Sequence, residues 1–169
     1  MQAHAGRSTV HTGGEVHVSS GEGTATSSGA ITIRSVNAGA AGTSGYLSFS
    51  SGSSVTGNSG YIHMGTGVAT AGRGGMVLIS VGSGTSSVGG MVQAHAGRST
   101  VHTGGAVVVT SGEGTATSSG VVLIRSSNSG VAGVSGSLLF SSGTSVTGNS
   151  GRVHMGTGAA TAGRGGAVV

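Results

Sequence analysis

The sequence contains no cysteine and no proline, and its charged residues are only Arg and Glu, with neither Lys nor Asp. Without cysteine, the chain cannot form disulfides, Cys-ligated zinc sites or thiol nucleophiles. Charged residues make up 6% and aromatic residues 2% of the chain, and the formal net charge is +4. The seven basic residues are spread over 169 positions. They form no basic cluster, so nucleic-acid binding is not expected.

Long apolar runs are also missing. No stretch approaches the roughly 18 apolar residues that cross a bilayer, so no membrane span is predicted. The first ten residues do not have the apolar core of a secretory leader.

The sequence is instead rich in glycine, serine and threonine, and it is repetitive. Residues 2–78 match residues 93–169 at an offset of 91, with 59 of 77 positions identical. We therefore describe 1–169 as a single array with long copies 1–91 and 92–169, the second one truncated. Each long copy is built from six shorter segments. Five are as long as Glu15–Gly29, and one, Ala30–Gly45 in the first copy, is longer by a single residue.

Each short segment follows one pattern. Its second position is aliphatic, its fourth is usually apolar, its seventh is nearly always glycine and its last is always glycine. Apolar residues two apart on a β-branched background are typical of a strand with one buried face. Glycine at a fixed position indicates either a positive φ or a backbone too crowded for a Cβ atom.

This pattern predicts an all-β fold, a two-sheet β-solenoid (β-helix) with 15–16-residue coils and about eleven rungs. Each segment would form one coil, and its second position would lie above that of the next coil, about 4.8 Å away. A single coil cannot bury its apolar face, whereas a stack of coils makes a continuous core. Val16, Ile31 and Leu47 are then expected inside.

The predicted stacking places two pairs of opposite charges on adjacent rungs. Arg7 and Glu22 occupy the eighth position of consecutive segments, and so do Arg98 and Glu113. Neighbouring rungs would bring each pair together, as in a cross-strand pair. Such exposed pairs would fix the register more than they would stabilise the fold.

Three replacements between the long copies indicate an assembly face. Val108, Leu123 and Leu139 stand where the first copy has polar residues. They occupy the third position of successive segments, which should face away from the core. An exposed apolar stripe of this kind is normally covered by a partner. We expect that partner to be the chain itself or a related segment, although neutral drift would also produce such replacements.

No residue pattern points to catalysis, a cofactor or a metal. The seven histidines do not fall at spacings that gather three or four ligands. The three glutamates do not supply the carboxylate pair of a glycosidase. We therefore expect a protein that is not an enzyme and holds no cofactor. The sequence does not decide whether the Ser and Thr side chains carry O-linked glycans.

The phrase SSGxxTxTSG followed by alternating apolar residues resembles Gly/Ser/Thr-rich repeats in large surface or extracellular proteins of algae and related protists. The resemblance covers the whole chain and implies a place outside the cell or on its surface. The predicted function is a structural segment of an extracellular fibre that assembles laterally and end to end. The alternative is an ice-binding or surface-adhesion solenoid, because threonine recurs at the tenth position of many segments.

Overall fold

The computed structural model describes residues 2–86 and 88–169, and these residues form neither helix nor β-strand. The prediction of a two-sheet β-solenoid is therefore wrong. All backbone–backbone hydrogen bonds recorded among the described residues close within a single short segment, such as the one from the Gly14 amide to the Gly6 carbonyl oxygen at 2.8 Å. The second half of a segment turns back on its first half, so one segment does not complete a coil. Among these residues, no helix has the length and apolarity that crossing a membrane requires.

The chain divides into two units, Met1–Ser80 and Val81–Val169. The boundary lies within the sixth short segment, earlier than the junction at 91 and 92 between the long sequence copies. Each unit is built from the same kind of short segment, and each is described here by itself.

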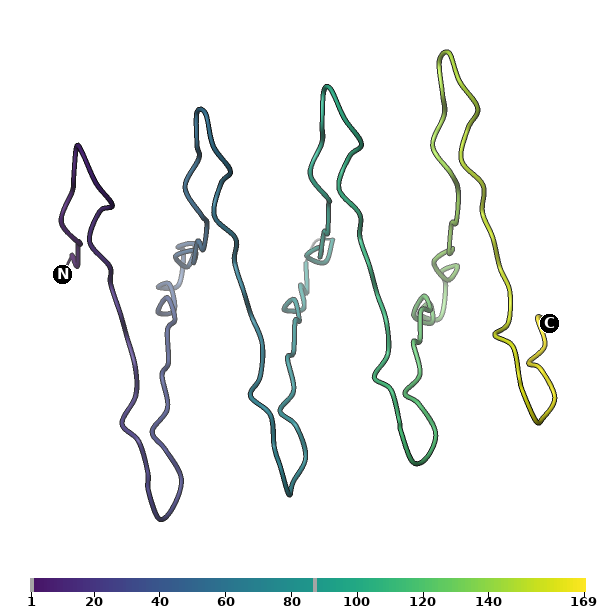
Figure 1. The fold of residues 1–169 in the computed structure, drawn as a ribbon, viewed down its shortest axis with the longest axis horizontal. Helices are drawn as coiled ribbons and strands as arrows, with labels where there is room; N and C mark the ends of the chain where they lie inside the picture. Colours follow the sequence, from purple (N-terminus) through teal and green to yellow (C-terminus); the bar gives the residue numbers. More distant parts are fainter. Residues whose placement is uncertain (1, 87) are drawn as a thin grey trace. The chain divides into compact units, whose positions relative to one another are not determined.

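Every short segment forms a narrow projection, which we call an arm. The chain runs outward, bends, and returns beside itself. The bends lie at residues 9–11, 24–26, 40–41, 55–57, 70–72, 85–86, 100–102, 115–117, 131–133, 146–148 and 161–163. They recur once per segment, so the short repeat of the sequence is the repeat of the arms (Figure 1).

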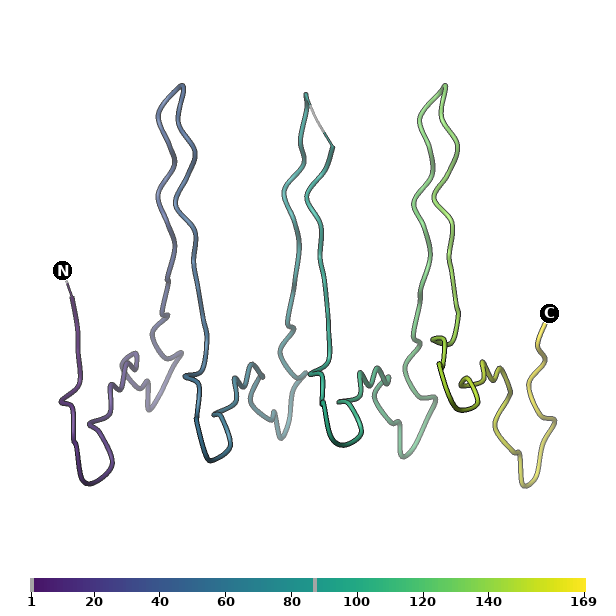
Figure 2. The ribbon, with the colours of Figure 1, turned by 90° about the horizontal axis from the view of Figure 1, so that it is seen from above.

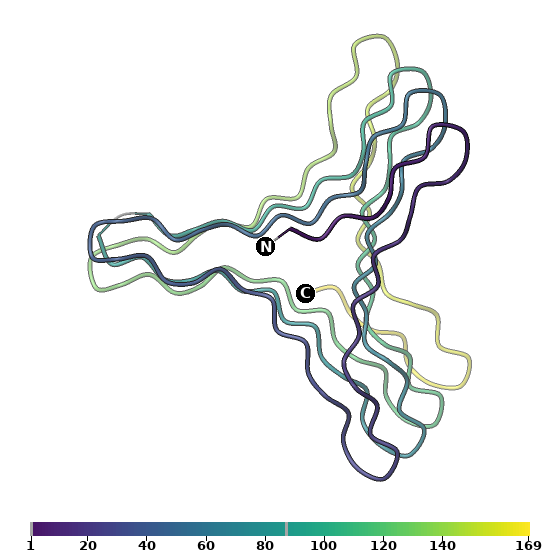
Figure 3. The ribbon, with the colours of Figure 1, turned by 90° about the vertical axis from the view of Figure 1, so that its left-hand side faces the viewer.

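Within each unit, successive arms point in three directions, so that every third arm points the same way (Figure 3). In the first unit, the arm that bends at 55–57 has the direction of the arm that bends at 9–11. In the second unit, the arms that bend at 100–102 and 146–148 share one direction. One turn of the chain therefore takes three short segments rather than one, and Figure 2 shows the turns of each unit spaced along its length.

The first five residues of each segment connect one arm to the next, and we call them the connecting segments. Side-chain exposure alternates along them, as the sequence pattern predicts. Val122 is 47% exposed, Leu123 is 72% exposed and Ile124 is 59% exposed. The backbone is therefore extended with alternating faces, although no neighbouring segment pairs with it in the described part of the chain.

The aliphatic residues expected to form a core are exposed. Val16 is 57% exposed, and Ile31 and Leu47 are each 50% exposed. No described residue is buried. The prediction of a core within one chain is wrong because successive turns do not contact each other closely enough to cover these side chains.

Candidate functional site

The base of each arm is a tight contact between two backbone stretches, which we call the neck. There the last glycine of a segment lies against its sixth residue. A Cβ atom on Gly29 would be 3.3 Å from Ser20 Cβ, and one on Gly166 would be 3.2 Å from Thr157 Cγ2. The same contact, at 3.5 Å or less, recurs in all eleven segments. The sixth residue is always Ala, Ser, Thr or Val.

Crowding, and not an unusual dihedral angle, explains the last glycine. No described glycine has a positive φ. Of the two reasons that the sequence left open, the structure therefore supports the lack of room for a Cβ atom. In several arms a backbone hydrogen bond also closes the neck, for instance from the Gly29 amide to the Gly21 carbonyl oxygen at 2.9 Å.

The seventh residue behaves differently. It is glycine in nine of the eleven segments, and each of these glycines has open space, with no atom within 4 Å of an added Cβ. Gly21 and Gly112 are examples. Their φ angles are not positive either. Nothing within the single chain explains why glycine recurs at this position.

A serine hydroxyl caps the bend of every third arm. The His11 amide donates to Ser8 Oγ at 2.9 Å, and the Gly57 amide donates to Ser54 Oγ at 3.0 Å. In the second unit, Ser99 and Ser145 accept the equivalent bonds at 2.9 and 3.0 Å. Each of these four serines lies three segments after the one before it. Within each unit, the capped bend therefore recurs once per turn.

The other two arm directions have their own residues. In each unit, the arm that follows a serine-capped arm bends at Thr-Ala, at 24–25 and 70–71 in the first unit and at 115–116 and 161–162 in the second. The third direction has Ile at the fourth position of each of its segments, namely Ile33, Ile79 and Ile124. A period of three segments is thus present in the sequence itself. The recurrence of the same residues in every third segment is the sequence pattern that indicates three segments per turn. It is not visible when each segment is compared only with the next.

The exposed surface is far larger than that of a folded monomer. The accessible area is 16935 Å² for a mass of 15.7 kDa. A compact monomer of this mass exposes about 7300 Å², and a fully extended chain about 22800 Å². Only Gly23, Ser99, Gly114 and Ser126 are even half-buried among the described residues, and all four lie in arms. The arms are therefore organised locally, whereas the connecting segments are not covered.

The predicted charge pairs, Arg7 with Glu22 and Arg98 with Glu113, stay predictions. Arg7 lies at the start of the outward half of one arm and Glu22 at the equivalent place in the next, and these arms point in different directions (Figure 3). The same holds for Arg98 and Glu113 in the second unit. Consecutive segments are therefore not stacked as successive coils, which was the premise of both pairs.

The three residues of the predicted assembly face are exposed. Val108, Leu123 and Leu139 are 78%, 72% and 86% exposed, each more than the aliphatic residue before it. They lie on three successive connecting segments, which run between differently directed arms (Figure 3). Their exposure leaves these side chains available to a partner, and the assembly face stays a prediction.

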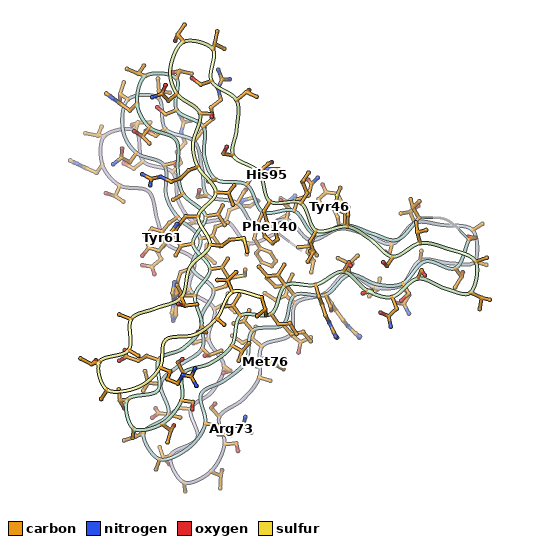
Figure 4. The ribbon with its side chains drawn as sticks, turned by 90° about the vertical axis from the view of Figure 1, so that its right-hand side faces the viewer. Tyr46, Tyr61, Arg73, Met76, His95 and Phe140 are labelled. Atoms are coloured by element: carbon orange, nitrogen blue, oxygen red, sulfur yellow. The ribbon has the colours of Figure 1, made fainter. Side chains whose placement is uncertain are left out.

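Labelled side chains of the first unit show the same three-sided arrangement. Tyr46, Tyr61 and Met76 are the first residues of successive segments, and Figure 4 shows them on three different sides. The tyrosines are 89% and 90% exposed. Each side of the unit therefore offers large side chains to solvent.

The described histidines gather into no metal cluster, and two small hollows lie near the surface. Among the described residues, no three His or Glu side chains gather as metal ligands. An open hollow of about 350 Å³ is lined by residues 34–37, and one of about 190 Å³ by residues 125–128. Both hollows lie at the base of an arm. These arms belong to the two longer segments, 30–45 and 121–136. In the first, Ser35 Oγ donates to the Gly45 carbonyl oxygen at 2.8 Å.

Threonines at the tenth position do not make a flat rank. Thr9 and Thr24 lie in bends of consecutive arms. Consecutive arms point in different directions (Figure 3), so their bends do not stack upon one another. The arrangement thus gives no support to an ice-matching surface of closely stacked threonines.

No protein-family model, curated protein sequence or solved structure matches the chain.

Proposed function

We propose that the chain is a structural, non-enzymatic segment of an extracellular fibre, which forms by association of copies of the chain laterally and end to end. The observation that carries the proposal is the surface area. With 16935 Å² exposed, the chain has more than twice the surface of a compact monomer of its mass. Aliphatic side chains recur at the second position of every segment. Their burial is the main favourable term in folding and association, and it requires other chains.

The regular arms support a structural role. Each is closed by the same neck and repeats at the same interval throughout both units. A repeated unit whose contacts are the same at each step suits a filament. The place outside the cell rests on the resemblance of the Gly/Ser/Thr-rich segments to surface and extracellular repeat proteins.

Sedimentation velocity of the full chain over a range of concentrations tests the proposal. We expect species much larger than 15.7 kDa, with filaments in electron micrographs of the same sample. A chain that sediments as a monomer at every concentration would overturn the proposal.

A further inference from the structure

The amount of surface that must be covered points to a particular kind of assembly. The chain exposes 16935 Å². Subtracting the roughly 7300 Å² of a compact monomer leaves about 9600 Å² per chain. A stable side-by-side contact covers about 800 Å² per partner. A few lateral contacts are therefore far too small, and the partner must run along the whole chain.

The positions of the exposed aliphatic side chains restrict the path that a partner chain can take. The aliphatic second position is exposed on all three sides of each unit, as at Leu47, Ile62 and Val77, which are 50%, 53% and 55% exposed. The connecting segments that carry them have no backbone partner among the described residues. A partner on one side would leave the other two sides as they are. The partner must therefore contact every side at every turn.

The recurrent seventh-position glycines are a second, independent observation. Gly21 has neither a positive φ nor any atom of its own chain within 4 Å of an added Cβ. Glycine costs conformational entropy on folding, so a position held as glycine through most segments needs a reason. The remaining reason for glycine at the seventh position is the close approach of another backbone. Because the glycine recurs in most segments, that approach must recur once per arm.

We infer that further copies of this chain wind about the same axis, with their connecting segments lying between successive turns of the first copy. A second copy has the same three segments per turn and the same aliphatic second position, so it matches on all three sides. A partner without this period would fit only locally. The inference rests on the proposed function and adds to it the identity and path of the partner.

Cysteine cross-linking tests this arrangement, because the chain has no cysteine of its own. The variants are Leu47→Cys, Ile62→Cys and Val77→Cys, one for each side of the first unit. Extended segments that pair lie about 4.8 Å apart, which is within the Cα separation of a disulfide. We expect each variant to give a covalent dimer as its main product on mild oxidation. In denaturant the same variants should stay monomeric.

The outcomes separate this inference from the proposed function. Assembled chains that cross-link from only one of the three sides, or from none, would show lateral association and overturn the interwound arrangement while the fibre stands. If a substitution prevents assembly, Leu138→Cys, Val153→Cys and Val168→Cys provide the equivalent set in the second unit.

A glycine pair gives a check without cross-linking. Gly21 and Gly74 both have open space around an added Cβ, but only Gly21 is a seventh residue. We expect Gly21→Ala to lower the fraction of chain that assembles and Gly74→Ala to leave it at the parent value. Equal assembly by the two variants would overturn the close approach at the seventh position, and with it the inference.

Discussion

Gly75 and Thr66 meet at the neck of their arm, where the Thr66 hydroxyl donates to the Gly75 carbonyl oxygen at 3.5 Å. A Cβ atom on Gly75 would lie 2.9 Å from Thr66 Cγ2 and 3.0 Å from Thr66 Cβ. These separations are too short for ordinary packing, so the glycine allows the two halves of the arm to close.

Gly75→Ala should therefore destabilise the assembled protein by about 1–3 kcal/mol, the usual cost of overpacking. The measurement is the urea midpoint of the assembled chain. Gly74→Ala is the matched control, because an added Cβ there meets no atom within 4 Å. Equal midpoints for the two variants would show that the neck does not need its glycine.

The serine caps should hold the bends. In the second unit, Ser99 Oγ accepts hydrogen bonds from the amides of His102 at 2.9 Å and Val101 at 3.4 Å. Ser99→Ala should cost about 0.5–1.5 kcal/mol, because it removes the acceptor of these amides. Hydrogen exchange at the His102 amide measures the effect. Ser99→Thr keeps a hydroxyl and should retain the protection. Loss of protection in both variants would mean that the hydroxyl is not the cap.

Deletions that remove a whole turn of three segments should be tolerated. Removing residues 15–60 takes out three whole segments, so the order of serine-capped, Thr-Ala and third-direction arms is kept. Removing residues 15–29 takes out one segment and disturbs that order in every later turn. We expect the longer deletion to co-sediment with the parent chain and the shorter one to do so much less. The opposite ranking would contradict three segments per turn.

The outward apolar residues of the second unit should promote lateral association. The change is the triple variant Val108→His, Leu123→Thr and Leu139→Ser, which restores the residues of the first long copy. Burying one aliphatic side chain contributes about 1.5–3 kcal/mol, so the variant should weaken bundling at least about tenfold. Light scattering measures bundling, and electron microscopy shows whether single filaments persist. Unchanged bundling would mean that these residues take no part in it.

Part of this organisation could be read from the sequence. The alternation of apolar and other residues predicted strands with one buried face, and this is wrong for the described residues, although exposure does alternate, as at Val122 (47%) and Leu123 (72%). The glycine that ends each segment was correctly interpreted as a backbone requirement, but the sequence left open whether a positive φ or crowding imposes it, and the structure shows crowding. Both are local properties, decided by backbone geometry within a few residues.

The prediction that one short segment closes a turn was wrong. Apolar spacing gives the faces of an extended segment, but it does not say how many segments complete a turn. The expectation that Arg7 lies beside Glu22 depends on one segment per turn. The recurrence of the serine cap from Ser8 to Ser54 contains the missing information, because it joins bends of the same direction. The predicted core of aliphatic second-position residues was wrong for a related reason: the residues that were expected to stack on one another belong to segments that point in different directions.

Within each unit, arms that point in the same direction have the same bend residues. This affects how such a protein can change in length. In each unit, serine-capped bends recur on one side and Thr-Ala bends on another. The long sequence copy comprises six segments, which is two whole turns. A gene that gains or loses one such copy would therefore lengthen or shorten the product while every side keeps its chemistry. Length could then evolve by duplication alone, with no new contact to be selected.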